Sequence, residues 1–82
     1  MNWYVYILKC ADNTLYTGIT NDIEKRIHDH NTSPSGAKYT KARRPVVLVY
    51  KKRKKNRSYA SIEEAQIKKL SREGKLGLIN KQ

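Results

Sequence analysis

The spacing of apolar side chains predicts a β-hairpin at the start of the chain. Residues 3–9, WYVYILK, and residues 15–20, LYTGIT, are rich in aromatic and β-branched side chains, which favour extended strands. The turn-forming residues Asp12 and Asn13 lie between them. The two segments are close enough along the chain to pair in antiparallel fashion through a short loop.

Three tyrosines stand on this hairpin, in a chain that has no phenylalanine. Because side chains alternate across a strand, Tyr4, Tyr6 and Leu8 are expected on one face of the first strand. Antiparallel pairing can bring Tyr6 beside Tyr16 on that face. The phenols are either half-buried strand residues that pack with a polar tip, or groups that take part in chemistry.

A helical period begins after the second strand. Isoleucines four residues apart form one apolar stripe, and Arg26 and His30, also four apart, share a neighbouring face. Asn21, followed three residues later by Glu24, forms a capping-box pattern that marks the helix start. We expect this helix to end near residue 31.

The second half of the chain predicts a loop, a strand and a helical segment. Residues 32–45 are rich in Pro, Gly, Ser and basic side chains and are expected to form a loop. Residues 46–53 predict a third strand. A helix is expected to start at Ser58 as N-cap and to be interrupted near Gly74, with a final short helix or turn over residues 75–80.

The element order is therefore β-β-α-β-α, followed by that final short segment. This order predicts a small three-stranded sheet flanked by helices, an α/β fold of the α+β type, in a single domain over residues 1–82. A chain of 82 residues buries a modest core, so a shallow surface site is expected rather than a deep cavity.

Charge is the second strong signal. Eighteen Lys and Arg face seven Asp and Glu, which gives a net charge of +11. Self-repulsion of this size favours a polyanionic partner, and we expect nucleic acid ahead of an anionic membrane or a merely solvated surface. Two basic stretches, 38–44 and 51–57, are the expected backbone contacts. The side chains assigned to this binding are Lys38, Tyr39, Lys41, Arg43, Arg44, Lys51, Lys52 and Arg53.

Other features of the sequence bear on the compartment. No run of about 18 apolar residues could span a bilayer, and the opening MNWYVYILKC lacks the basic segment of a signal peptide. Cys10 is the single cysteine, so it cannot form an internal disulfide. We expect Cys10 to be buried and the protein to be a cytoplasmic monomer.

Few residue types are left for catalysis. The sequence holds no HExxH motif, no cysteine cluster and no P-loop, which disfavours zinc and nucleoside triphosphate chemistry. Tyr, Arg, His, Lys and Glu can support phosphodiester hydrolysis, which needs a base near the attacking water, a cation at the phosphate and a metal ion. One glutamate can hold Mg²⁺, which keeps most of its water shell.

The motifs of the chain occur in a specific order. YVY at 4–6 and YTG at 16–18 precede Arg26 and His30 in EKRIHDH, and this arrangement resembles the GIY-YIG endonuclease superfamily. The closer resemblance is to the small single-domain bacterial branch of this superfamily, and it covers residues 3–79. The motifs that carry it are LYTGIT, GAKYT, ARRP, LVY and KKLSR. The resemblance implies a metal-dependent DNA endonuclease, directed by DNA structure in repair or processing, that uses one Mg²⁺ or Mn²⁺ ion.

The resemblance also implies roles for individual residues. Tyr6 and Tyr16 match the two motif tyrosines, and the second is expected to prepare the attacking water. Arg26 matches the arginine that stabilises phosphate charge, and His30 matches a histidine or tyrosine on the same helix face. Alternatively, His30 stabilises the C-terminal end of its helix through the dipole. Glu64 matches the metal-binding glutamate and completes the implied catalytic set.

Other interpretations stay open at several positions. Gly18 matches the motif glycine, which lets substrate or backbone approach closely, or it is simply a strand-end glycine. Tyr4 stands where the first motif has glycine, which leaves open how much room the site has. Glu63 competes with Glu64 as the metal ligand, and Glu64 could instead form a capping box with Ser61.

Two other functions stay open as well. The alternative is a nucleic-acid-binding module with weak or no nuclease activity, for which the positive charge alone would suffice. RNA is the less favoured partner, and a basic protein that binds RNA or ribosome surfaces would bind RNA more tightly than DNA at matched salt.

Overall fold

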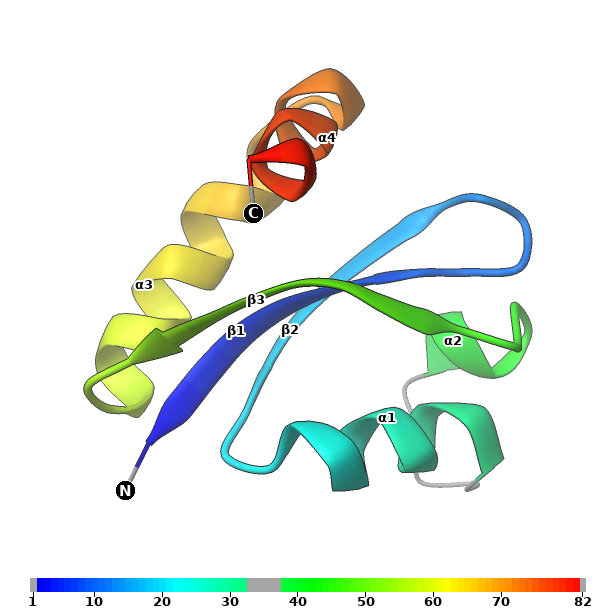
Figure 1. Ribbon diagram of the computed structural model, residues 1–82, viewed down its shortest axis with the longest axis horizontal. Helices are drawn as coiled ribbons and strands as arrows, with labels where there is room; N and C mark the ends of the chain where they lie inside the picture. The colour runs from blue at the N-terminus through cyan, green and yellow to red at the C-terminus, as the bar shows by residue number, and fades with distance from the viewer. Residues whose placement is uncertain (1, 33–37, 82) are drawn as a thin grey trace.

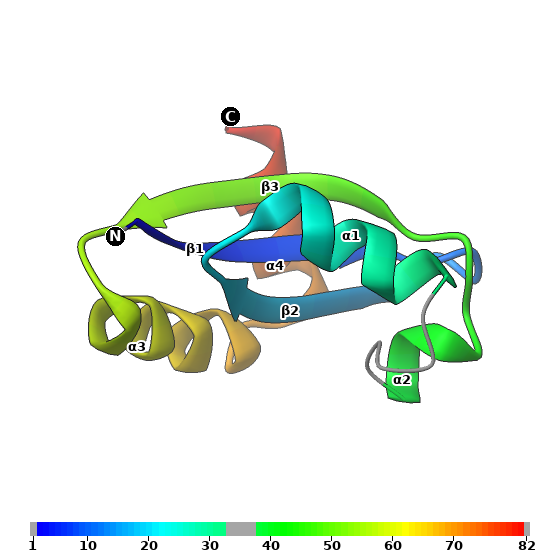
Figure 2. The same cartoon turned by 90° about the horizontal axis from the view of Figure 1, so that it is seen from below.

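The computed structural model describes residues 2–32 and 38–81 and confirms the predicted α/β architecture. Three antiparallel strands form one sheet in the order β2-β1-β3, and helices pack against both of its faces (Figures 1 and 2). The elements are β1 (Trp3–Lys9), β2 (Leu15–Thr20), α1 (Ile23–Thr32), α2 (Lys38–Lys41), β3 (Val47–Lys54), α3 (Arg57–Lys68) and α4 (Arg72–Asn80).

The two faces of the sheet carry different helices. Val5 and Ile7 of β1 form a core with Ile67 of α3 and with apolar residues of α4. Tyr6 and Leu8 point to the opposite face, where they pack with the isoleucines of α1. Figure 2 accordingly shows α1 in front of the sheet and α4 behind it. The alternation predicted for the first strand is therefore confirmed.

The hairpin register sets the relative position of the two motif tyrosines. Tyr6 lies opposite Gly18 across the β1–β2 pair, and Tyr16 lies opposite Leu8. Tyr16 is thus a diagonal neighbour of Tyr6, on the same face of the sheet. The expectation that the hairpin brings both phenols to one face is confirmed.

The helix starts differ from the prediction by one or two residues. α1 is capped by Asp22, whose carboxylate accepts a hydrogen bond from the Lys25 amide at 3.1 Å, so the predicted Asn21 cap is wrong. The Asn56 side chain caps α3 by accepting a hydrogen bond from the Tyr59 amide, so the predicted Ser58 cap is also wrong. In both places residues with similar capping ability stand close together, and sequence spacing does not choose between them.

The interruption of the C-terminal helical segment was placed at the wrong residue. The break falls between α3 and α4, and Ser71 caps α4 by accepting a hydrogen bond from the Gly74 amide at 3.1 Å. Gly74 therefore lies in the first turn of α4. The hydroxyl cap decides where this helix begins, and the glycine is accommodated inside it.

The predicted loop between the first helix and the third strand contains the short helix α2. α1 ends at Thr32, and residues 33–37 of that loop lie outside the described residues. Cys10 is buried as expected, and burial raises the pKa of its thiol.

The strand β3 changes from apolar to basic along its length. It begins with VLVY and ends with KKRK, and it is an edge strand of the sheet.

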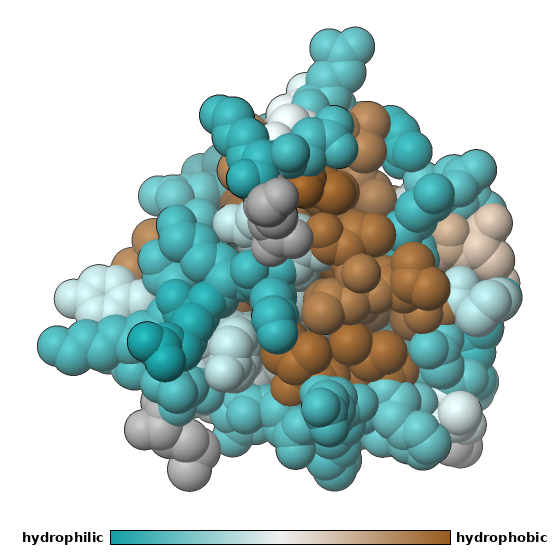
Figure 3. Space-filling view, viewed as in Figure 1, coloured by the Kyte–Doolittle hydropathy of each residue, from teal (hydrophilic) through white to brown (hydrophobic). Residues whose placement is uncertain are grey.

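Some apolar surface is exposed. Val47 at the start of β3 is 54% exposed. The space-filling view shows apolar surface gathered near the centre of the face seen in Figure 3. None of the helices that the structure describes is long and apolar enough to cross a membrane.

Candidate active site

The phenol of Tyr6 lies directly over Gly18. A Cβ atom placed on residue 18 would come within 2.5 Å of the Tyr6 hydroxyl oxygen and 2.7 Å of the ring carbon that carries it. Any side chain at residue 18 would therefore displace the tyrosine. Gly18 has no positive φ, so close approach rather than backbone conformation explains why a glycine fits here.

Tyr6 is joined to the first helix by a buried hydrogen-bonded chain. Its hydroxyl is 3.0 Å from His30 Nε2, and His30 Nδ1 is 2.6 Å from the Thr40 hydroxyl in α2. Tyr6 is 2% exposed and His30 and Thr40 are fully buried. The chain Tyr6–His30–Thr40 thus links β1, α1 and α2 through groups that can pass a proton between them.

Burial holds both titratable members of this chain in their neutral forms. Desolvation lowers the pKa of His30 to about 4, and the charges of Arg26 and Arg44 lower it further, whereas Asp29 acts in the opposite direction. Desolvation raises the pKa of Tyr6 to about 12. At neutral pH a neutral imidazole therefore faces a protonated phenol, so one of the two His30 nitrogens carries no proton and accepts a hydrogen bond.

The remaining predicted catalytic residues lie around the same phenol. The Arg26 guanidinium lowers the pKa of Tyr6 through a hydrogen bond and through its charge, which opposes the effect of burial. Tyr16 and Glu64 act in the opposite direction and raise this pKa. Side chains from β2 and α1 thus lie around one residue of β1, and Glu64 of α3 is close enough for its charge to act on the same phenol.

The two adjacent glutamates of α3 face different surroundings. Glu63 lies 3.3 Å from the Lys54 ammonium and 3.9 Å from that of Lys52, and its charge contributes to a raised pKa of Tyr50. The Glu64 carboxylate lies 3.5 Å from the Lys68 ammonium, and its negative charge raises the pKa of Tyr6. Ser61 lies inside α3 and not at its N-cap, so the alternative of a capping box between Ser61 and Glu64 is wrong.

Tyr16 is held in a stack of rings. Its ring meets His30 edge-on, with centroids 5.2 Å apart, and lies against the ring of Tyr39 at 6.0 Å and 25°. The Arg43 guanidinium covers the Tyr39 ring at 3.9 Å, and Arg43 is ion-paired with Asp12 at 3.0 Å. Tyr39 of α2, held in turn by Arg43 and the hairpin turn, therefore packs against Tyr16 in addition to His30.

The residues predicted to bind nucleic acid fall into two groups. Tyr39, Arg43 and Arg44 make intramolecular contacts, since Arg44 donates hydrogen bonds to the backbone carbonyls of Asp29 and His30. Gly18 is buried under Tyr6. The other members of the predicted set, all of them exposed, are Lys38, Lys41, Lys51, Lys52 and Arg53. Binding by any of these residues stays a prediction.

Tyr4 lies on the same face of β1 as Tyr6, two residues before it. It pairs with Thr20 and Arg53 across the sheet and is partly buried. An open cavity of about 260 Å³ adjoins the Arg26 side chain at the start of α1. This cavity is shallow, as expected for a domain of this size, and is lined by Thr20, Asn21, Asp22, Lys25, Arg26 and Asp29.

The donor atoms available at the site favour a hard divalent ion. Within the described residues there is no group of three His, Cys, Asp or Glu side chains able to hold a metal together. Glu64 offers carboxylate oxygens, and its ion pair with Lys68 at 3.5 Å is exchangeable because the Lys68 side chain is 56% exposed. A single carboxylate, completed by water and substrate oxygens, fits Mg²⁺ or Mn²⁺.

The sequence did not identify Thr40 as a member of the site. Thr40 lies in the GAKYT motif that was assigned to a DNA-binding loop, and its burial against His30 depends on the fold of α2. The GAKYT motif was the only feature of the sequence that pointed to this residue.

Comparison with known proteins gives a consistent result. The model of the GIY-YIG catalytic domain matches residues 2–77. A UPF0213 protein of Syntrophus aciditrophicus is 58% identical over 76 residues, which cover 93% of this chain and 87% of that protein. The UPF0213 protein DP2720 of Desulfotalea psychrophila is also 58% identical, over 84% of this chain, which spans 63% of that protein's length.

A solved structure agrees with these matches. The solution NMR structure of the UPF0213 protein BH0048 from Bacillus halodurans superposes with a TM-score of 0.64 and 43% identity, and covers all of this chain and 86% of that one. The family match, the relatives and the shared fold together identify this chain as a member of the GIY-YIG family, alongside the small UPF0213 proteins.

Proposed function

We propose that this protein is a metal-dependent DNA endonuclease that hydrolyses phosphodiester bonds at the site around Tyr6. The observation that carries the proposal is that Tyr16, Arg26 and His30 lie around one buried phenol, while the charge of Glu64 raises the pKa of the same phenol. These side chains come from β2, α1 and α3, so no single element requires them to meet. Membership of the GIY-YIG family supports nuclease activity. That the substrate is DNA and that cleavage needs a metal ion are part of what we propose.

Arg26 supplies the fixed positive charge. Its guanidinium lies beside Tyr6 and lines the open cavity at the start of α1, so it is accessible to a phosphate. Charge builds on the phosphate oxygens as water attacks, and a preorganised cation stabilises that charge.

The neutral Tyr6–His30 pair serves as the proton acceptor. With a pKa of about 12, about one Tyr6 phenol in 10⁵ is ionised at pH 7, so a standing phenolate is not the base. The attacking water can instead give its proton to the Tyr6 oxygen while the phenolic proton passes to His30 Nε2. Tyr16, which is only partly buried, orients the water, and solvent protonates the leaving oxygen.

Glu64 is the residue that would hold a divalent ion. When bound, Mg²⁺ or Mn²⁺ polarises the phosphate and stabilises the leaving oxygen. The exposed lysines and Arg53 of β3 bind the DNA backbone, which gives salt-dependent affinity with little sequence preference.

Cleavage and binding assays test this function. Duplex, flapped and branched DNA are incubated with Mg²⁺ or Mn²⁺, and nicking is followed on denaturing gels. We expect Arg26→Ala to abolish the nicking that the wild-type chain shows. DNA affinity, measured by fluorescence anisotropy without metal, should stay within about threefold of wild type, because only one of many positive charges is removed. Absence of nicking by the wild-type chain on every substrate and metal would refute the endonuclease.

The second candidate function is a nucleic-acid-binding module without nuclease activity. The net charge of +11 favours it, because this charge suffices for binding without any catalytic site. It predicts DNA affinity without nicking, and tighter binding of RNA than of DNA at matched salt would direct the assignment to RNA.

A further inference from the structure

Two tyrosines have exposed side chains, and their environments differ. Tyr39 is 39% exposed, but its ring stacks with Tyr16 and lies under the Arg43 guanidinium. Tyr59 is 51% exposed, and within the described residues its ring makes no aromatic, cation–π or side-chain hydrogen-bond contact. The sequence pointed to Tyr39 as the aromatic contact for nucleic acid, whereas Tyr59 has the accessible ring.

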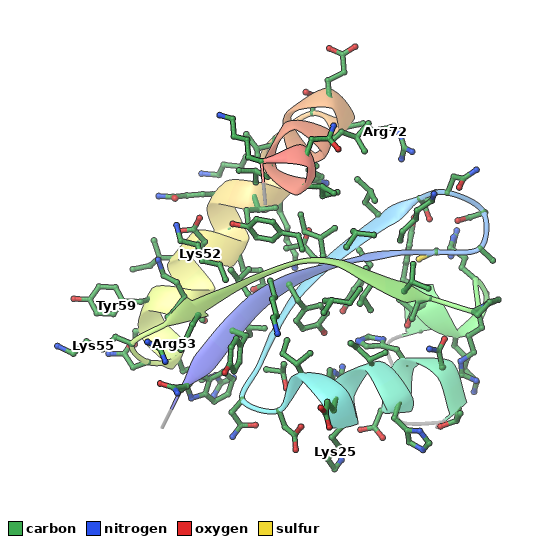
Figure 4. All side chains as sticks on the ribbon, in the orientation of Figure 1. Lys25, Lys52, Arg53, Lys55, Tyr59 and Arg72 are labelled. Atoms are coloured by element: carbon green, nitrogen blue, oxygen red, sulfur yellow. The ribbon has the colours of Figure 1, made fainter. Side chains whose placement is uncertain are left out.

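The local structure presents the Tyr59 ring to solvent. The Asn56 side chain accepts a hydrogen bond from the Tyr59 amide at 3.0 Å and fixes the first turn of α3. Ala60, the next residue, is fully buried against the sheet. Because neighbouring residues on a helix are about 100° apart, Tyr59 projects sideways and outward. Figure 4 shows its ring pointing away from the body of the molecule.

Positive charge surrounds this ring. Lys52, Arg53 and Lys55 are exposed and lie at the same end of the molecule as Tyr59 (Figure 4). The sequence has no acidic residue between Asp29 and Glu63, and Glu63 is already paired with Lys52 and Lys54. An exposed aromatic ring within a cationic surface matches the way proteins bind single strands, with bases stacked on rings and phosphates held by cations.

The cationic surface begins beside the proposed active site. Tyr6 lies opposite Lys51, and Tyr4 lies opposite Arg53, so these four side chains share one face of the sheet. Arg53 is two residues farther along β3 than Lys51, a step of about 7 Å. β3 ends at Lys54 and α3 begins at Arg57, so a strand of nucleic acid that follows β3 from the Tyr6 site comes to the start of α3 at the end of the sheet.

We propose that Tyr59 stacks on an unpaired base of a single-stranded DNA segment, while Lys52, Arg53 and Lys55 bind its flanking phosphates. The inference rests on the proposed endonuclease function and narrows its substrate to DNA that carries a single-stranded segment. The ring has an accessible face for a base, the charge is complementary to a polyanion, and the surface continues from the site of cleavage.

Binding without metal tests the proposal independently of cleavage. Fluorescence anisotropy in EDTA compares a labelled 12-nucleotide single strand with a blunt duplex. We expect Tyr59→Ala to weaken single-strand binding about tenfold and duplex binding less than twofold, because base–aromatic stacking contributes about 1–3 kcal/mol. Tyr59→Phe keeps the ring and should retain wild-type affinity.

Two matched controls are available in the chain. Ile62 lies on the same helix and is 55% exposed, so Ile62→Ala removes a comparable exposed apolar side chain without an aromatic ring. Lys55→Ala and Arg72→Ala each remove one exposed positive charge, and Figure 4 places Arg72 at α4, away from Tyr59. We expect only Lys55→Ala to weaken single-strand binding beyond about twofold.

Photochemical crosslinking locates the contact directly. A single strand that carries 5-iodouracil should crosslink to Tyr59, as identified by mass spectrometry of the peptide. Equal losses for Tyr59→Ala and Ile62→Ala, equal losses on single strand and duplex, or crosslinks confined to Tyr39 would overturn the proposal. If the protein nicks DNA but shows any of these results, the proposed endonuclease function stands and the Tyr59 contact is wrong. If Tyr59 binds single strands as proposed but the protein nicks no DNA, the endonuclease function is wrong instead.

Discussion

The hydroxyl oxygen of Tyr6 occupies the space that a side chain at residue 18 would need, 2.5 Å from the Cβ position of Gly18. The tyrosine of the first motif and the glycine of the second are therefore one steric unit. The pairing of these two residues across β1 and β2 places the phenol beside His30 and Arg26, within reach of the charge of Glu64.

The first prediction concerns this steric unit. Gly18→Ala should lower the free energy of unfolding by about 1–3 kcal/mol, because the new methyl group overlaps with the buried Tyr6 ring. Urea denaturation measures the change. Gly77→Ala is the matched control, since a Cβ at Gly77 meets nothing within 4 Å and alanine favours the helix interior, so stability should rise by about 0.5–1 kcal/mol. Equal effects of both substitutions would contradict the steric account.

The second prediction concerns the pH dependence of stability. The pKa of His30 is about 4 in the folded chain and about 6.5 when unfolded, so the unfolded state binds more protons between these values. Stability is therefore complete above pH 6.5 and falls as pH drops towards 4, by on the order of 3 kcal/mol. Urea denaturation between pH 4.5 and 7.5 measures this slope.

A pair of histidine variants assigns that slope. His30→Gln should flatten the pH dependence, because the group that binds the extra proton on unfolding is gone. His28→Gln changes an exposed histidine of the same helix and should keep the wild-type slope. If His30→Gln keeps the wild-type pH dependence of stability, another group binds the extra proton on unfolding. The assignment of a neutral, buried His30 would then be wrong.

The third prediction concerns the ring stack around Tyr16. Tyr39→Ala removes the ring that stacks on Tyr16, and we expect the nicking rate to fall about tenfold because Tyr16 loses its fixed position. Tyr39→Phe keeps the stack and should keep the rate. DNA affinity should change less than twofold in either variant, since Arg43 and Tyr16 cover the Tyr39 ring. A larger loss of affinity than of rate would instead make Tyr39 a DNA contact.

Much of the fold could be predicted from short-range patterns. The hairpin was found because aromatic and β-branched residues alternate on both sides of a turn, and the shared face of Tyr6 and Tyr16 followed from strand geometry alone. The caps were missed by one or two residues because Asn21 and Asp22, or Asn56 and Ser58, are chemically similar competitors.

The site was harder to predict where its contacts span long stretches of chain. The basic residues of 38–44 are visible in the sequence, but the carbonyls that bind Arg44 and the ring that Arg43 covers come from folding. Sequence spacing also left Glu63 and Glu64 in competition. Which of the two holds the metal stays a prediction: the lysines of β3 pair with Glu63, whereas the charge of Glu64 raises the pKa of Tyr6.

The fourth prediction, and the most direct test of the proposed active site, is the nicking rate of Glu64→Gln against that of Glu63→Gln. Both substitutions remove one negative charge from adjacent residues of α3, and the rates are measured on flapped DNA over a titration of Mg²⁺. We predict a loss of at least about 100-fold for Glu64→Gln, because the carboxylate that would hold the metal is removed, and a rate within about threefold of wild type for Glu63→Gln. A wild-type rate for Glu64→Gln, or the same loss in both variants, would contradict the account.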